Sequence, residues 1–181
     1  MTLELIERLT REARGMDVAF LVIGGHAVAH HGYERLTLDI DFLTQGDFRE
    51  AWQSIMVKLG YSVRGINPAF DQFFHTAPGW PQVDIMYVSK ATWTKLHAEA
   101  VPKASGRVTV HVPSPEHLVA LKLHAACDPQ RKDSAKDWND ILHLVRRHKL
   151  DPEKPEFSAL VIRYGGPKGL EKLKSLMKTS Q

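Results

Sequence analysis

The chain has 181 residues and a formal net charge of +3; 43% of its residues are hydrophobic and 25% are charged, which is ordinary for a globular protein. This length indicates one domain, or one domain with a small appendage, and allows a substantial core. We expect a cytoplasmic protein without a membrane segment, because no apolar stretch reaches transmembrane length and the N-terminal sequence MTLELIERLT carries acids where a signal peptide is basic. The single cysteine, Cys127, excludes an intramolecular disulfide, and we expect it to be a small buried side chain.

The first part of the chain alternates helical and strand patterns, with Gly or Pro between many of the segments. In chain order these patterns predict a helix at 2–14, a buried strand at 17–23, a short helix at 25–31, a strand at 37–43, a helix at 47–59, strands at 61–64, 70–76 and 82–88, a helix near 90–99 and a strand at 107–112. Asp47 is the candidate N-cap of the third helix. The order predicts an α/β (α+β) fold with a mixed β-sheet.

After residue 112 the sequence becomes helical. PSPEHLVALKLHAAC opens with a capping serine and a proline, KDSAKDWNDILHLVRRH is strongly amphipathic, and two shorter helices follow on either side of Gly165-Gly166-Pro167. We therefore predict an α/β domain at 1–112 and a helical region at 113–181 that packs on it. The first part has 11 basic and 12 acidic residues (net −1) and the second 13 and 9 (net +4), which suits either a polyanionic partner or solvated helix faces.

Two aspartates interrupt the apolar strand segment TLDIDFL. Because strand side chains alternate between faces, Asp39 and Asp41 are expected on one face with Thr37, and Leu38 and Ile40 on the other. The two carboxylates would lie roughly 7 Å apart at their Cα atoms. Like charges held in this way repel each other, and a divalent cation between them removes the cost.

Asp84 interrupts a second apolar strand, in QVDIMYV, and a third carboxylate there would complete a two-metal site for phosphoryl transfer. Upstream, Gly24 and Gly25 end a strand and begin a helix, where bare backbone amides can bind phosphates. Each feature alone is ordinary: such acids are commonly solvated or salt-bridged, and a Gly-Gly pair is commonly a turn. Their ordered combination is far more specific than any one of them.

This combination resembles the nucleotidyltransferase superfamily that shares its fold with DNA polymerase β. The longer segment GGHAVAHHGYERLTLDIDF is also similar to the AbiEii-type group of bacterial nucleotidyltransferases, many of them toxins of toxin–antitoxin pairs. That group reads GG-x-A and then H-G-x-x-R-x-T-x-D-I-D. Its helical region starts with PSPE-x-L-x-x-x-K, which here is PSPEHLVALK, so the similarity covers roughly residues 18–145.

The resemblance implies a Mg²⁺-dependent reaction that uses a nucleoside triphosphate, with two metal ions. It assigns Asp39 and Asp41 to the Mg²⁺ that bridges the nucleotide phosphates. It assigns Asp84 to the second ion, where this carboxylate would favour deprotonation of the attacking hydroxyl. Gly24 and Gly25 would hold the triphosphate.

Two basic residues are further candidates for nucleotide binding. Lys122 would lie near the β- and γ-phosphates if it is not simply a surface lysine. Arg35 would contact a phosphate or pair with the aspartates. The segment RKDSAKDWNDI supplies the acids Asp133, Asp137 and Asp140. Asp137 and Asp140 would cap the helix, pair with basic side chains or reach the site.

The leading hypothesis is a nucleotidyltransferase that acts as the toxin of a two-gene system, has a cognate antitoxin partner, and modifies RNA, with tRNA the first candidate, or a protein. An alternative uses the same chemistry on a small hydroxylated molecule, as antibiotic nucleotidyltransferases do. A third is a non-catalytic nucleotide- or partner-binding protein. Trp80, in a turn-rich loop before Asp84, could stack on a base.

Overall fold

A computed structural model describes residues 2–130 and 134–179 of the chain. The chain divides into two compact units: unit 1 consists of residues 1–27 and 35–113, and unit 2 of residues 28–34 and 114–181. In the described ranges, no helix combines the length and the apolar character needed to cross a bilayer.

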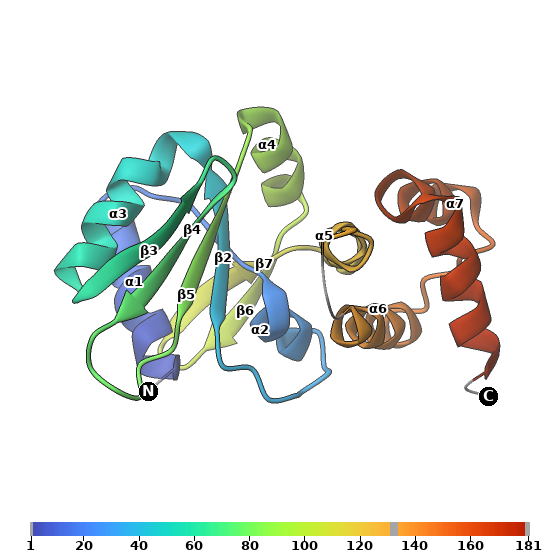
Figure 1. Cartoon of the computed structure of the whole chain (residues 1–181), viewed down its shortest axis with the longest axis horizontal. Helices are drawn as coiled ribbons and strands as arrows, with labels where there is room; N and C mark the ends of the chain where they lie inside the picture. Colours follow the sequence, from blue (N-terminus) through green and yellow to red (C-terminus); the bar gives the residue numbers. More distant parts are fainter. Residues whose placement is uncertain (1, 131–133, 180–181) are drawn as a thin grey trace. The chain divides into compact units, whose positions relative to one another are not determined.

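Unit 1 is built around a five-stranded sheet in the order β1-β2-β5-β4-β3, in which only the β2–β5 pair is parallel (Figure 1). The elements in chain order are α1 (Thr2–Gly15), β1 (Leu21–Val22), α2 (Gly24–His30), β2 (Ile40–Gln45), the 3-10 helix η1 (Gly46–Phe48), α3 (Arg49–Lys58), β3 (Tyr61–Asn67), β4 (Phe70–His75), β5 (Val83–Val88), α4 (Lys90–Ala98), β6 (Val101–Ser105) and β7 (Val108–Val112). Strands β6 and β7 form a separate antiparallel hairpin. The mixed sheet confirms the predicted α/β class.

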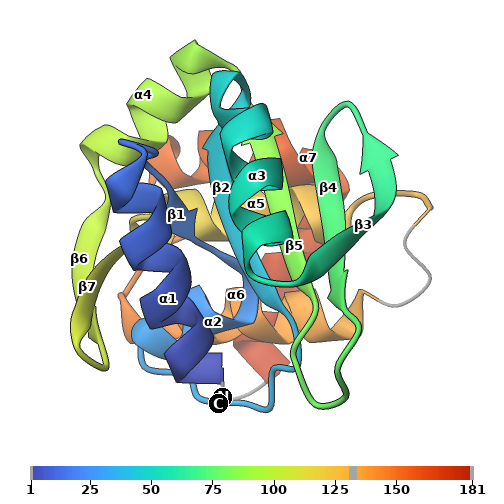
Figure 2. The same cartoon turned by 90° about the vertical axis from the view of Figure 1, so that its left-hand side faces the viewer.

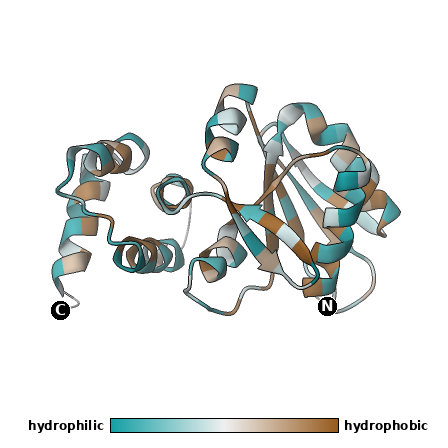
Figure 3. Cartoon of the chain, turned by 180° about the vertical axis from the view of Figure 1, so that it is seen from behind, coloured by the Kyte–Doolittle hydropathy of each residue, from teal (hydrophilic) through white to brown (hydrophobic). Residues whose placement is uncertain are grey.

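Helices α1 and α3 cover one face of the sheet (Figure 2). Under α3, the ring of Phe42 on β2 stacks on Trp52 at a centroid distance of 5.5 Å, and Phe20 contacts both rings edge-on at 5.2 and 5.4 Å. Phe42 and Trp52 are fully buried, and burying a large apolar side chain contributes about 1.5–3 kcal/mol. The strands of the sheet alternate between hydrophobic and more polar residues (Figure 3). This packing fixes β2, and with it the polar residues that β2 directs to the opposite face.

Unit 2 consists mainly of three helices: α5 (Pro115–Ala126), α6 (Ala135–Arg147) and α7 (Pro155–Thr179). The Ser114 hydroxyl caps α5 by accepting a hydrogen bond from the His117 amide at 3.3 Å, as the capping pattern predicted. The apolar face predicted for α6 is buried and comprises Trp138, Ile141, Leu142 and Val145. Helix α7 is broken at Gly166, whose φ of 70° and ψ of 175° are not helical, so the two helices predicted around Pro167 are confirmed.

Two strand predictions are wrong in their extent. The strand expected at 37–43 begins only at Ile40, whose amide donates to the Gln82 carbonyl at 2.9 Å. The preceding residues lie outside the sheet, so Leu38 is 70% exposed instead of packing on the apolar face. The strand expected at 17–23 is reduced to Leu21–Val22, because only these two residues pair with β2.

Three local predictions also need correction. Asp47 does not cap a helix: its carboxylate accepts a hydrogen bond from the Gln45 amide, and neither η1 nor α3 has a side-chain cap. Strand β6 was not predicted, because Pro102 breaks the strand pattern in its sequence. Cys127 is exposed instead of buried, since it is the C-cap residue of α5.

Candidate active site

The Gly24-Gly25 turn lies directly against the carboxylate-bearing segment. Gly24 has a φ of +63°, and a Cβ atom there would overlap the carboxylate of Asp41. A Cβ atom at Gly25 would overlap the Thr37 hydroxyl. Only glycine allows the backbone at the start of α2 to approach these groups so closely. The sequence motif therefore corresponds to a three-dimensional contact between the turn, Thr37 and Asp41.

Asp41 and Asp84 are neighbours across the parallel strands β2 and β5, where their Cα atoms are register partners. Directly opposed residues point to the same face of a sheet, so both carboxylates leave the face opposite Phe42 and Ile85. Asp39 lies two residues before Asp41, just outside the strand, and its charge helps to raise the pKa of Asp84. The structure thus gathers all three predicted carboxylates at the start of β2 and β5.

Asp84 is half-buried and accepts two side-chain hydrogen bonds. Its pKa lies above the ordinary value for aspartate, first because the carboxyl group is half-buried and also because of the negative charge of Asp39. Two amides oppose this shift: Gln82 Nε2 donates to Oδ1 at 2.6 Å and Gln72 Nε2 donates to Oδ2 at 3.5 Å. Sequence reasoning missed both glutamines. The antiparallel register of β4 and β5, which pairs Gln72 with Asp84, is the signal that could have identified one of them.

Arg35 belongs to the same cluster. Its Nη1 donates to Thr37 Oγ1 at 3.1 Å and to the Leu36 carbonyl at 3.3 Å, and it would lie 3.1 Å from a Cβ atom at Gly25. The guanidinium therefore lies over the glycine turn, in unit 1, beside the backbone amides that begin α2. A cationic side chain beside the backbone N–H groups of a helix N-terminus is a combination that can bind an anion.

A pocket of about 410 Å³ opens beside Asp39. It lies between two loops of unit 1 and the start of α1, and it is lined by Thr2, Leu36, Thr37, Leu38, Asp39, Gly79, Trp80, Pro81 and Gln82. The Trp80 ring stacks on His75 at a centroid distance of 4.7 Å, and the Arg8 guanidinium lies 5.7 Å from its centroid. The pocket combines an indole, apolar side chains and a carboxylate, a lining that suits an amphipathic ligand.

Lys122 belongs to unit 2 and is buried, not a surface residue. Its Nζ lies 3.1 Å from Asp137 Oδ1 and 2.8 Å from Asp140 Oδ2, two carboxylates one turn apart on α6. Asp137 and Asp140 are therefore ion-pair partners that join α5 to α6. Asp133, the third acid of that segment, lies outside the described residues.

The donor chemistry of the carboxylate cluster fits Mg²⁺, which prefers oxygen ligands and few carboxylates. Asp39, Asp41 and Asp84 supply such oxygens, and a cation would relieve the like-charge contact that raises the pKa of Asp84. In the described part of the chain, however, no three His, Cys, Asp or Glu side chains are already arranged as a ligand set. The residues fit the ion, and the coordination itself stays a prediction.

The family comparison matches residues 69–180, more than half of the chain, to the family described as "Nucleotidyl transferase AbiEii toxin, Type IV TA system". This match confirms the family that the resemblance indicated; it includes Asp84 and Lys122 but not residues 24–41. It also extends past residue 145, where that resemblance ended, through α7. No curated protein matches the chain.

Several solved nucleotidyltransferases share the fold. ANT(2″)-Ia, crystallised with adenylyl-2″-tobramycin, superposes with a TM-score of 0.66 over 96% of this chain and 97% of its own, at 17% identity. The lincosamide antibiotic adenylyltransferase LnuA, with bound lincomycin, gives 0.54 over 73% of this chain and 89% of its own, at 15% identity. A putative nucleotidyltransferase from Thermotoga maritima gives 0.53 over 67% and 83%, at 18% identity. These likenesses confirm the predicted fold.

Proposed function

Because the chain belongs to the AbiEii nucleotidyltransferase family and is a nucleotidyltransferase, we propose that it transfers a nucleoside monophosphate from a nucleoside triphosphate to an acceptor hydroxyl. The observation that carries this proposal is the pairing of Asp41 with Asp84 across β2 and β5, with the Gly24 backbone packed against Asp41. This arrangement supports a site in which the acids and the glycine turn act together. The acids serve metal binding, and the turn serves the triphosphate.

Asp39 and Asp41 would hold one Mg²⁺ and Asp84 would take part in holding a second. Bound Mg²⁺ neutralises the charge that develops on the phosphates during in-line displacement. Asp84 would also favour deprotonation of the attacking hydroxyl, the role that the resemblance to the superfamily implies. Gln72 and Gln82 orient its two oxygens through their amide hydrogen bonds.

The chemical step forms one bond and breaks one. The acceptor oxygen bonds to the α-phosphorus, and the bond from that phosphorus to the oxygen bridging to the β-phosphate breaks, so that pyrophosphate leaves. The hydroxyl proton passes to Asp84. The residues of the chain contribute by positioning and by charge, which is how phosphoryl transfer is generally accelerated.

The triphosphate would rest on the amides of Gly24 and Gly25, with Arg35 alongside. Lys122 is the further cation proposed for the β- and γ-phosphates. Its two carboxylate partners already neutralise its charge, so a role in nucleotide binding requires its Nζ to serve phosphate and carboxylates together.

For the acceptor we propose RNA, with tRNA the first candidate, or a protein, and for the biological role a cytoplasmic toxin with a cognate antitoxin. The family description and the excess of basic residues in 113–181 support this. A small-molecule acceptor is the second candidate. The pocket of about 410 Å³ beside Asp39 favours it, since its volume is typical of small-molecule sites. ANT(2″)-Ia in complex with adenylyl-2″-tobramycin and LnuA with bound lincomycin have the same fold.

The test is transfer of label from each of the four nucleoside triphosphates, labelled at the α-phosphate, with Mg²⁺ and total cellular RNA. The matched variants are Asp39→Ala and Asp41→Ala, with Asp47→Ala, an exposed acid after the same strand, as the control. Label in RNA with the wild type and the control, but not with the two site variants, would support the proposal. Label in protein or in an added aminoglycoside would support the proposed transfer reaction but identify a different acceptor. Transfer that persists in both site variants would refute the assigned site.

A further inference from the structure

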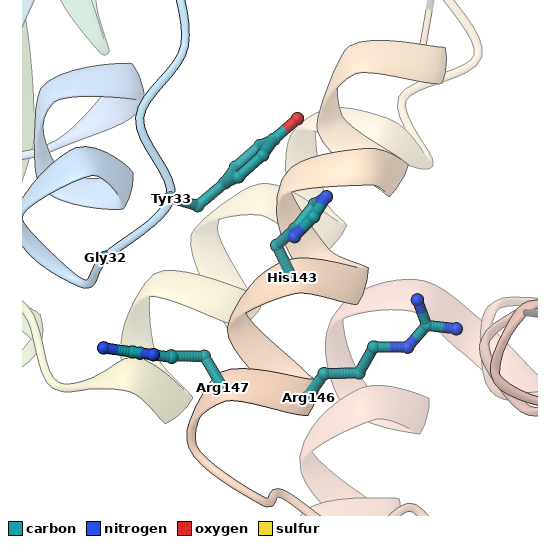
Figure 4. Close-up of a pocket in the computed structure, with 5 residues that line it drawn as sticks. All are labelled: Gly32, Tyr33, His143, Arg146 and Arg147. Atoms are coloured by element: carbon teal, nitrogen blue, oxygen red, sulfur yellow. The ribbon is translucent and has the colours of Figure 1, made fainter. Parts of the chain in front are cut away.

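A second pocket, of about 440 Å³, lies within unit 2 and shares no residue with the carboxylate cluster. It is lined by Gly32, Tyr33, His143, Arg146 and Arg147 (Figure 4). The first two come from the turn after α2, and the other three from the last turns of α6. Its volume lies in the range of ordinary ligand sites, which begins at about 300 Å³.

The turn is fastened to α6 by three contacts. The Tyr33 ring stacks on His143 at a centroid distance of 3.6 Å and an angle of 8°, and its hydroxyl accepts a hydrogen bond from Asn139 Nδ2 at 2.7 Å. At Gly32, where φ is +94°, a Cβ atom would lie 3.1 Å from Arg147 Nε, so this guanidinium packs over the bare backbone. These contacts fix one aromatic and one cationic wall of the pocket.

The two cations of the pocket have no recorded partner within residues 2–130 and 134–179. Among the described residues, neither Arg146 nor Arg147 has a hydrogen-bond or ion-pair partner for its guanidinium, and none of the five lining residues is acidic. Cations at the end of a helix are favoured by the helix dipole. That effect explains the presence of arginines on α6, but it does not require a pocket in which the phenol of Tyr33, from the turn after α2, stacks on the imidazole of His143.

We propose that this pocket binds phosphate esters. Arginine forks match the geometry of phosphate oxygens, and neutral imidazole N–H and phenol O–H groups can donate to the same oxygens. Arg147 extends towards Gly32 and Arg146 extends towards the other side of α6 (Figure 4), so the two would contact separate phosphates. The phosphate can come from the backbone of an RNA strand or from a free nucleotide, and the experiment separates these sources.

The experiment uses the full chain without Mg²⁺ and with a chelator, so that metal-dependent nucleotide binding at the carboxylates does not contribute. Binding of a fluorescent single-stranded RNA is followed by anisotropy, and binding of inorganic phosphate and a nucleoside monophosphate by calorimetry. The test variant is Arg146→Gln/Arg147→Gln. The matched control is Arg163→Gln/Lys168→Gln, which removes two exposed charges from α7 of the same unit.

Loss of about tenfold or more in RNA affinity in the test variant but not in the control would identify a strand backbone as the ligand. The slope of log affinity against log salt should then fall by about 1.4, since each phosphate contact on a single strand contributes about 0.7. Loss of phosphate or monophosphate binding alone would identify a free phosphate ester. The proposal is overturned if the wild type binds none of these probes or if the test variant binds them as the wild type does. Circular dichroism checks folding, and Arg146→Gln alone serves if the double variant does not fold.

Discussion

Asp41 and Asp84 are paired in register across the only parallel strands of the five-stranded sheet, and the backbone of Gly24 lies against the Asp41 carboxylate. Replacing either acid by asparagine keeps the shape of the side chain and removes the charge that a metal ion requires. We expect Asp41→Asn and Asp84→Asn to lower kcat by about a hundredfold or more, because metal charge stabilisation is worth several kcal/mol and about 1.4 kcal/mol is tenfold in rate. Steady-state transfer assays measure the loss.

The control for this prediction is Asp47→Asn. Asp47 follows β2 on the same chain segment, is exposed, and contacts only Gln45 through its side chain among the interactions described. Activity within about twofold of the wild type is expected, as for most surface substitutions. If Asp47→Asn lost as much activity as Asp41→Asn, general charge would explain the loss and the paired acids would not be the site.

Asp84 also gives a prediction about stability and pH. Its pKa is raised in the folded protein, mainly by burial. The folded state is therefore less stable when Asp84 is ionised than when it is protonated. The stabilising contribution of the protonated form is complete below the unfolded pKa of about 4 and is lost as the pH rises through the folded pKa. Asp84→Asn imitates the protonated form. We therefore expect it to have a higher Tm than the wild type at pH 7 without Mg²⁺, with a difference that shrinks towards pH 4.

Thermal unfolding at several pH values measures this difference. The same experiment on Asp47→Asn, an exposed acid, should show no such trend. A lower Tm for Asp84→Asn at pH 7 would mean that the hydrogen bonds from Gln72 and Gln82 outweigh the desolvation of the carboxylate.

The carboxylates could be predicted from sequence because each breaks an apolar strand pattern, and Gly24-Gly25 because paired glycines end such a pattern. The start of β2 could not be predicted, because the alternation of apolar and polar residues in TLDIDFL begins before the first residue that pairs in the sheet. Leu38 continues the period of Ile40 and yet is exposed, because sheet pairing stops at the hydrogen bond from Ile40 to Gln82. Local periodicity does not contain that information.

Contacts between segments that are distant in the sequence could not be predicted from the sequence either. Gln72 reaches Asp84 only because β4 and β5 pair in one particular register. From its sequence position, Lys122 could equally be an exposed lysine on a helix surface. Its burial depends on where α6 packs against α5. In both cases the residue types carry no local signal, and the partner is set by tertiary packing.

Gly24 is predicted to tolerate no side chain. Gly24→Ala introduces a Cβ that overlaps the Asp41 carboxylate at a backbone φ of +63°, a conformation that costs an L-residue of order 1–2 kcal/mol. We expect a lower Tm and a raised KM for the nucleoside triphosphate, because both the turn and the acid must move. The matched control is Gly15→Ala: Gly15 ends α1, and a Cβ there has no neighbour within 4 Å among the described residues. Comparable losses in both variants would show that glycine flexibility alone, and not the contact with Asp41, explains the effect.

Lys122 is expected to be essential for stability. Lys122→Met leaves Asp137 and Asp140 buried without their shared cation, and breaking a buried ion pair from one side costs about 3–5 kcal/mol. Urea unfolding measures the change. Adding Asp137→Asn and Asp140→Asn to Lys122→Met removes the two buried negative charges and should restore much of the stability. If the restored protein still binds nucleoside triphosphate as the wild type does, Lys122 has no direct part in nucleotide binding.

Asp71 anchors a second buried polar cluster, on the sheet face opposite Asp84. Its carboxylate, fully buried, accepts hydrogen bonds from Gln53 Nε2 at 3.0 Å, from the Tyr87 hydroxyl at 3.1 Å and from Arg49. Burial and the Asp71 charge raise the pKa of Tyr87, which keeps the phenol a hydrogen-bond donor. Arg49 also donates to the Asn67 carbonyl at 2.7 Å, so it joins the β3–β4 turn to the start of α3.

Arg49→Ala is therefore expected to destabilise the protein by about 2–3 kcal/mol, because it removes a charged hydrogen-bond donor from a buried acceptor. Tyr87→Phe removes one neutral donor and should cost about 1–2 kcal/mol. In a double-mutant cycle, Arg49→Ala combined with Asp71→Asn should cost less than the sum of the single changes, since the lone charge is then gone. Urea unfolding of the four proteins gives the coupling free energy. Strict additivity would mean that Arg49 stabilises the turn through Asn67 alone and that Asp71 is satisfied by Gln53 and Tyr87.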